Sequence, residues 1–93
     1  MPTIRQQIIA LLSRGAYEAG EMSQLIGIRE KEVCDHLLHV SRSVTSRGRR
    51  LEVTPSRCLA CGHVFRDRKR LTRPSRCYRC KSERLTEPRY QVI

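Results

Sequence analysis

The sequence predicts an α+β protein, with three short helices in its first half and a small antiparallel β unit in its second half. Three observations lead to this prediction. Apolar residues in the first half recur at helical spacing, the second half contains two C-x2-C pairs, and charge is divided unevenly between the halves. In a chain of only 93 residues, these differences indicate two small cores, one over residues 1–48 and one over 49–93.

A capping box predicts the start of the first helix. Thr3 is followed three residues later by Gln6, so each side chain can accept a hydrogen bond from the other's backbone N–H. Gly15 stands where a left-handed residue would end the helix. The pattern therefore predicts a helix over about 4–14, with an apolar stripe formed by Ile4, Ile8, Leu11 and Leu12.

Two further helices are predicted on either side of a tight turn. The second covers about 18–26, Gly27 follows as a left-handed residue, and Ile28 is an apolar plug in the turn. The third ends near Arg47, with Gly48 as its cap. Its apolar stripe consists of Val33, Leu37, Val40 and Val44, and Leu38 is expected to widen that stripe.

Two short helices joined by a glycine turn form the helix-turn-helix pattern. Residues 21–37 resemble the winged-helix version found in transcription regulators, except that Arg29 stands where those families usually have Ser or Thr. The resemblance implies that the third helix enters the major groove. Its first turns are acidic, with Glu30, Glu32 and Asp35, so affinity for DNA must come from later turns or from elsewhere. A three-helix bundle without groove contact is the alternative.

Four cysteines predict a metal site in the second half. The spacing Cys58-x2-Cys61-x15-Cys77-x2-Cys80 fits the template of two C-x2-C pairs that bind one zinc ion. Four thiolates close a tetrahedron, so the zinc is expected to be structural and unable to activate water. An iron–sulfur site, two disulfides and a thioredoxin-like redox pair are the alternatives. Cys34, near His36 and His39, is expected to be half-buried instead of binding a second metal.

An internal repeat supports a zinc ribbon. Residues 55–61 (PSRCLAC) match residues 74–80 (PSRCYRC), and each proline favours an extended approach to its cysteine turn. Gly62 follows the first pair and can take a positive φ, whereas Lys81 stands at the equivalent place in the second. The ribbon is predicted to contain short strands, and these cover about 50–54, 63–67, 69–73 and 84–92.

The charge distribution indicates a polyanionic partner. Residues 1–40 carry four basic and five acidic side chains, whereas residues 41–93 carry fifteen basic and four acidic ones. An excess of this kind favours nucleic acid and argues against an enzyme that acts on a small molecule. The expected nucleic-acid contacts are Lys31, His36, Arg42, Ser43, Arg47, Arg49, Arg50, Arg66, Arg68, Lys69 and Arg70. Tyr78 and Tyr90 are aromatic residues that could stack on bases, although Tyr90 alternates with Val92 as a core residue would.

Several features of the sequence argue against an enzyme, a protein with a targeting signal and a membrane protein. No nucleophile and base occur together in a pocket-forming pattern, so no catalytic residue is assigned and we expect no enzyme activity. Residues 4–12 are interrupted by polar side chains and lack a cleavage site, and no run approaches the ~20 apolar residues that span a bilayer. We therefore expect a cytoplasmic protein with no membrane partner and reduced thiols.

Taken together, the chain resembles a family of small transcriptional regulators, mainly archaeal, in which a helix-turn-helix domain is fused to a zinc ribbon. The resemblance rests on residues 21–37, the stretch from Arg42 to Arg50, and the repeated Pro-Ser-Arg-Cys-x-x-Cys. It implies binding of double-stranded DNA in transcription control, with the four paired cysteines as zinc ligands. Two alternatives stay open: a protein that binds RNA or the ribosome, and a protein-interaction adaptor of the transcription machinery. A homodimer is also left open.

Overall fold

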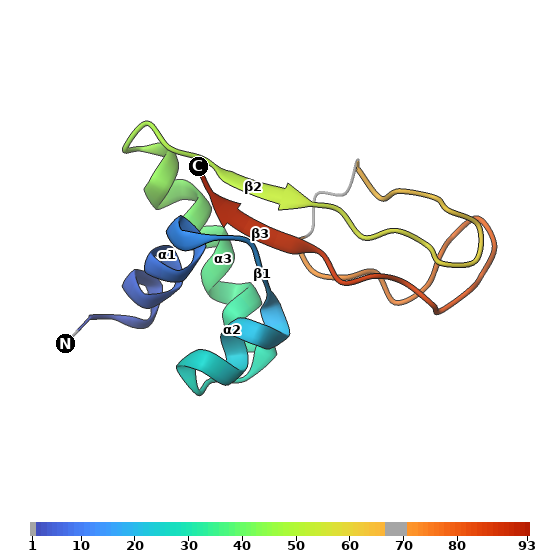
Figure 1. Ribbon diagram of the computed structural model, residues 1–93, viewed down its shortest axis with the longest axis horizontal. Helices are drawn as coiled ribbons and strands as arrows, with labels where there is room; N and C mark the ends of the chain where they lie inside the picture. The colour runs from blue at the N-terminus through green and yellow to red at the C-terminus, as the bar shows by residue number, and fades with distance from the viewer. Residues whose placement is uncertain (1, 67–70) are drawn as a thin grey trace.

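A computed structural model describes residues 2–66 and 71–93. The elements, in chain order, are α1 (Ile4–Arg14), β1 (Tyr17–Glu18), α2 (Ala19–Ile26), α3 (Glu30–Thr45), β2 (Leu51–Thr54) and β3 (Arg89–Val92). The molecule is elongated, with extents of 45 × 28 × 19 Å. The helices gather at one end, and β2 and β3 lead away from them into a loop-rich segment at the other end (Figure 1). Within the described ranges, no helix has the length and apolar character needed to cross a membrane.

Helix α1 has the bounds that the sequence predicts, and its capping box is present. The Gln6 N–H donates to the Thr3 hydroxyl at 3.1 Å, and the Thr3 N–H donates to the Gln6 side-chain oxygen at 2.8 Å. Gly15 differs from the expectation of a left-handed residue, because its φ of 177° is extended backbone. The chain passes almost directly from α1 into β1 and needs no reversal at Gly15.

The turn between α2 and α3 has helix-turn-helix geometry. Gly27 is left-handed, with φ of 83°, and its N–H donates to the Ser23 carbonyl at 2.9 Å. The Ser23 hydroxyl in turn donates to the carbonyl of Ile28. Arg29 provides no side-chain cap to α3 and instead forms an ion pair with Glu32 at 3.1 Å. Gly27 therefore sets the angle between the two helices.

One hydrophobic core joins all three helices to the last strand. Helix α1 packs against β3, and α3 packs against α1, α2 and β2. Tyr90 and Val92 of β3 are buried among the helix residues. The helical contribution to this core consists of Ile8, Leu12, Ala19, Met22, Val33, Leu37, Val40 and Val44. The C-terminal strand is thus part of the helical core.

The sheet is antiparallel, in the order β1-β3-β2. Val53 pairs with Tyr90, and Tyr17 pairs with Tyr90 from the other side. The predicted strand at 50–54 is present as β2, and residues 89–92 of the predicted 84–92 form β3; both strands lie against the helices. The division at residues 48 and 49 stays a prediction.

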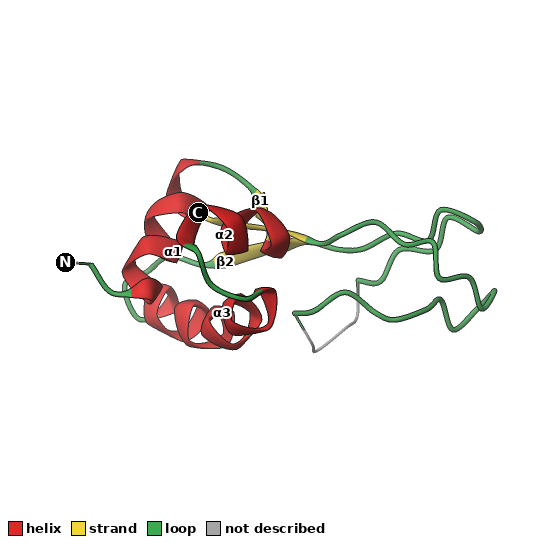
Figure 2. Cartoon of the chain, turned by 90° about the horizontal axis from the view of Figure 1, so that it is seen from below, coloured by secondary structure: helices red, strands yellow, loops and turns green. Residues whose placement is uncertain are grey.

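Residues 55–88, which we call the ribbon, are inserted in the connection between β2 and β3 and project away from the helices (Figure 2). Within the predicted strand at 63–67, the described residues 63–66 form one bridge, between Val64 and Arg57, and residue 67 lies outside the described residues; a second bridge joins Cys58 to Leu85. The prediction for 69–73 falls partly on residues 67–70, which lie outside the described residues, and 71–73 contains no strand. The ribbon has its own core, formed by Cys58, Phe65, Cys77 and Leu85. The predicted α+β fold, three helices followed by a small antiparallel β unit, is confirmed.

Candidate metal centre and nucleic-acid interface

The two C-x2-C turns of the ribbon have the same backbone geometry. In the first, the Gly62 N–H donates to the Cys58 carbonyl at 2.9 Å, and in the second the Lys81 N–H donates to the Cys77 carbonyl at 2.8 Å. Gly62 has φ of 79° and Lys81 has φ of 66°. Lys81 therefore adopts the left-handed conformation despite its side chain, because the turn requires it. The sequence repeat is a structural repeat of two metal-binding turns.

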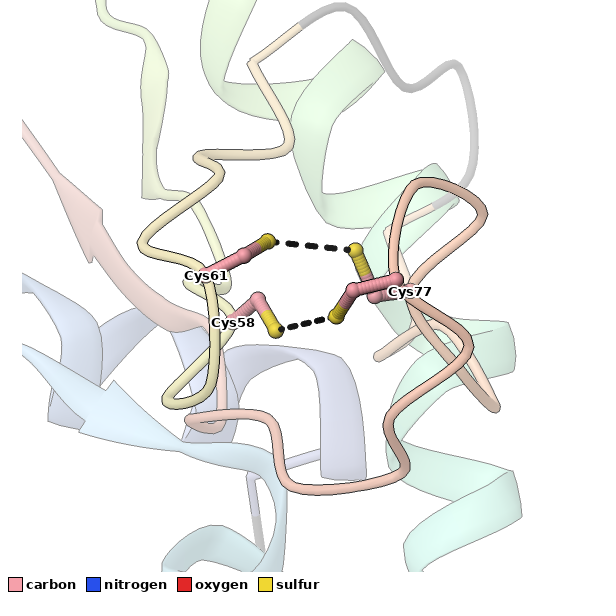
Figure 3. A group of neighbouring side chains, drawn as sticks. Cys58, Cys61 and Cys77 are labelled. Atoms are coloured by element: carbon pink, nitrogen blue, oxygen red, sulfur yellow. Dashed lines mark hydrogen bonds between the residues drawn. The ribbon is translucent and has the colours of Figure 1, made fainter.

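The four sulfur atoms of these turns meet in one place. They all lie within 4.8 Å of one another, with Cys58 Sγ 3.5 Å from Cys80 Sγ and Cys61 Sγ 3.7 Å from Cys77 Sγ. Figure 3 shows Cys58 and Cys61 approaching from one turn and Cys77 from the other. A tetrahedral zinc with Zn–S bonds of ~2.3 Å separates its sulfurs by about 3.8 Å, so the donor set fits the ion. All five cysteines are free thiols.

The backbone of the turns tunes the acidity of the thiols. The N–H of Cys61 donates to the Cys58 sulfur and, with the N–H of Ala60, outweighs burial to lower the pKa of Cys58 to about 6. Burial raises the pKa of Cys77, but hydrogen bonds from the N–H groups of Cys80 and Arg79 together lower it by more, so its pKa lies below the ordinary value. The N–H of Ser82 lowers the pKa of Cys80, but hydrogen bonds with the other three thiols and burial raise it to about 12.

The pKa of Cys58 is lowered whereas that of Cys80 is raised, and neighbouring thiols disfavour the ionisation of all four at once. Four sulfurs at this separation cannot all carry negative charge without a counter-ion. A zinc ion held by Cys58, Cys61, Cys77 and Cys80 would neutralise them and fix the two turns against each other. Because four protein ligands complete the tetrahedron, the site has a structural role, as the sequence predicts.

Cys34 lies apart from this centre, on α3, and is half-buried as expected. Burial, followed by the charge of Glu30, raises the pKa of its thiol. His36 accepts a hydrogen bond from Arg5 Nε at 3.3 Å. Among the described residues, the paired cysteines form the one group of three or more metal-ligating side chains that come together.

Helix α3 presents its polar face to solvent. Lys31, Asp35, His39 and Arg42 are exposed there, whereas the predicted contacts His36 and Ser43 are only partly exposed. Leu38 does not widen the buried stripe as expected, because its side chain is 53% exposed. It lies about 100° around the helix from Leu37, on the side away from the core. An exposed leucine on this face is a candidate contact that the sequence pattern did not reveal.

Basic side chains gather where α3 ends and β2 begins. Arg47, Arg49 and Arg50 are all exposed in this stretch, and Arg50 forms an ion pair with Glu52 at 3.4 Å. Arg42, Arg47 and Arg49 take part in no ion pair with another described residue. Arg66 is exposed on the ribbon. The other predicted ribbon contacts, Arg68, Lys69 and Arg70, lie outside the described residues.

Comparison with known proteins gives a match over nearly the whole chain. Residues 3–52 match the family described as PF0610-like, N-terminal, and residues 55–93 match the PF0610 rubredoxin-like zinc beta-ribbon domain. The solution NMR structure of protein PF0610 from Pyrococcus furiosus is similar, with a TM-score of 0.81 and 33% sequence identity. The alignment covers 97% of this chain and 88% of that one. No curated protein matches the chain.

Proposed function

This chain belongs to the PF0610-like family, with its PF0610-like N-terminal domain and rubredoxin-like zinc ribbon, and we propose that it is a DNA-binding transcriptional regulator. In this proposal, α3 enters the major groove of double-stranded DNA and the basic residues near its end contact phosphates. The ribbon, held by one structural zinc, extends the contact along the duplex. The protein acts as a binding module without catalytic activity.

The observation that carries the proposal is the uncovered polar face of α3. The opposite face is buried through Val33, Leu37, Val40 and Val44, so the helix is held firmly against the core while its outer face is free to enter a groove. On that outer face, Arg42 can donate to guanine or phosphate, and Leu38 can contact a thymine methyl group. A helix presented in this way fits the geometry of a recognition helix.

The charge distribution supports contact with phosphates. Arg47 and Arg49 lie just beyond the C-terminal end of α3 and, within the described part of the chain, have no acidic partner. The acidic start of α3 is partly neutralised, because Glu32 pairs with Arg29 at 3.1 Å. If the protein neutralises about six phosphates, log K should fall with log salt at a slope near −5.

A charge-matched pair of variants tests the proposal. Arg42 and Arg14 are each the basic residue in the last turn of a helix, so replacing either by Ala removes one charge and the same favourable interaction with the helix dipole. Duplex affinity and its salt dependence are measured by fluorescence anisotropy on a DNA site selected from a random pool. We expect Arg42→Ala to weaken binding and to reduce the salt slope by about one, and Arg14→Ala to change neither.

Other outcomes would contradict the proposal. A salt slope near zero in the unmodified protein would remove its electrostatic basis. Equal losses in the two variants would show that charge alone, without α3, determines binding. Preference for a structured RNA over a duplex of equal charge would favour the RNA-binding alternative, and failure to retain any nucleic acid would favour a protein adaptor.

A further inference from the structure

Tyr78 is a large aromatic side chain that the fold leaves in solvent. Tyr90 is 1% exposed and Tyr17 is partly buried, whereas Tyr78 is 67% exposed. It lies in the second metal-binding turn, directly after Cys77. The equivalent residue of the first turn, Leu59, is 53% exposed. Each turn therefore presents an apolar side chain outward at the same position, and only the second one is aromatic.

The ring of Tyr78 is held in place from one side. It lies 5.0 Å from the ring of His63 at an interplanar angle of 81°, and 6.0 Å from the ring of Phe65 at 80°. His63 and Phe65 are themselves in contact, with centroids 4.8 Å apart. Phe65 is buried in the ribbon core together with Cys58 and Cys77. The exposed ring is thus anchored to the metal-stabilised core, which reduces the entropy it would lose on binding a partner.

The surroundings of Tyr78 are strongly basic. Arg76 and Arg79 lie on either side of it in the sequence, and both are exposed. The segment that follows adds exposed Lys81 and Arg84 against one acidic residue, Glu83. Within the described residues, the ion pairs of the protein include none of these four basic side chains. An anchored aromatic ring among unpaired arginines combines the two features by which proteins bind single strands, a positive surface for the backbone and a platform for a base.

We propose that Tyr78 stacks on an unpaired base and that the ribbon thereby binds single-stranded nucleic acid. The contact is distinct from the duplex contact proposed for α3, because bases in an intact duplex are stacked on each other and do not offer their faces. It does not depend on α3 or on the proposed regulatory role. DNA and RNA single strands share the required chemistry, namely a phosphate backbone and an accessible base face.

The test uses the full zinc-loaded chain and two labelled probes of about twelve nucleotides, an oligothymidylate and an oligouridylate. Binding is followed by fluorescence anisotropy and by tyrosine emission, which no tryptophan obscures in this chain. Loss of one stacked base typically weakens binding about 5- to 150-fold, so we expect Tyr78→Ala to fall in that range and Tyr78→Phe to stay within about twofold of the unmodified protein. The relative affinities for the two probes identify DNA or RNA as the preferred strand.

Leu59→Ala is the matched control, because it removes an exposed apolar side chain from the equivalent position of the other turn. We expect it to bind both probes as the unmodified protein does. Zinc content is measured for every variant, and Tyr78→Leu replaces Tyr78→Ala if the latter loses zinc.

The proposal is overturned if neither probe binds, or if Tyr78→Ala binds as tightly as the unmodified protein. Equal losses in Leu59→Ala and Tyr78→Ala would also overturn it, since they would indicate a general apolar surface that suits a protein partner. Duplex binding without single-strand binding would refute this inference and leave the proposal for α3 intact. The reverse result would refute the proposal for α3 alone.

Discussion

Removing the metal should destabilise the helical core, although no ligand lies in that core. The ribbon occupies the 34 residues between Thr54 and Arg89, which are themselves paired in the sheet. Among the described residues of the ribbon, Phe65 and Leu85 are the non-cysteine side chains of its core, and their burial contributes roughly 3–6 kcal/mol. A structural zinc contributes about 10–16 kcal/mol in small zinc-binding domains. Without zinc, we therefore expect the ribbon to unfold first.

The size of the effect on the helices follows from loop closure. In the folded protein, the bridge between Cys58 and Leu85 continues the pairing of β2 with β3, so only a few residues on each side are unpaired. Unfolding the ribbon replaces this short connection with a flexible loop of 34 residues. Lengthening this connection from about six residues to 34 is about two and a half doublings, and each doubling costs about 0.6 kcal/mol. The pairing of β3 with β2 is therefore weakened by about 1.5–2 kcal/mol.

Far-UV circular dichroism can measure this loss, because the helices of the described chain all lie between Ile4 and Thr45. For a domain of this size, about 1.5–2 kcal/mol corresponds to a decrease in the midpoint of helix unfolding of about 6–16 °C. The comparison is between zinc-loaded protein and protein treated with a strong chelator. Cys34→Ser serves as a control, since that cysteine lies outside the metal centre and should leave the difference unchanged.

Two results would refute this reasoning. If the helical signal melts at the same temperature with and without zinc, the ribbon does not restrain β3 and the loop-closure argument fails. If chelation abolishes the helical signal at low temperature, the two cores form a single cooperative unit and the helices cannot fold without the metal.

Three further predictions concern single positions. The stabilisation from ionised Cys58 is complete above its ordinary pKa of 9.0 and is lost as pH falls through about 6, so the urea midpoint of ribbon unfolding should decrease as the pH is lowered from 9 to 6; a midpoint that does not change over that range would contradict the shift. Lys81→Gly should relieve the strain of a left-handed residue and stabilise the ribbon by up to about 1 kcal/mol. Gly62→Ala should introduce the same strain and destabilise the ribbon by a similar amount. Both changes are measured as changes in zinc affinity by competition with a chelator. Gly27→Ala should lower the free energy of unfolding in urea by about 1 kcal/mol, because alanine is strained at a φ of 83°. No atom lies near the new Cβ, so no steric clash adds to this cost, and an unchanged midpoint would show that the turn can rearrange.

Local signals in the sequence predicted local structure well. The bounds of α1 follow from Thr3, Gln6 and the apolar stripe, and the metal centre follows from cysteine spacing, because both depend on residues close together in the chain. Lys81 stands where the first turn has a glycine, yet its φ is positive like that of Gly62. The hydrogen bonds of the turn and the convergence of the sulfurs determine this conformation more strongly than the residue's own preference.

Long-range pairing could not be predicted in the same way. The alternation of Tyr90 and Val92 correctly indicated one buried face, but periodicity does not identify the core in which that face is buried. Tyr90 pairs with Tyr17, which is distant from it in the sequence, and the Tyr90 hydroxyl donates a hydrogen bond to the carbonyl of Leu71. Leu38 was misplaced for a related reason, because two adjacent leucines on a helix point in different directions and only the packing of α1 and α2 decides which is buried.

The ribbon is attached to the helical core by two adjacent antiparallel strands, and this double attachment distinguishes it from a domain at the end of a flexible linker. A single linker allows its two domains to reorient independently, so a ligand that touches both must bear the entropy of aligning them. Here β2 and β3 enter and leave the ribbon side by side, which restricts its rotation about the connection. A long ligand that contacts both parts therefore meets a bivalent surface of nearly fixed spacing, and it gains avidity only if its own contact points match that spacing.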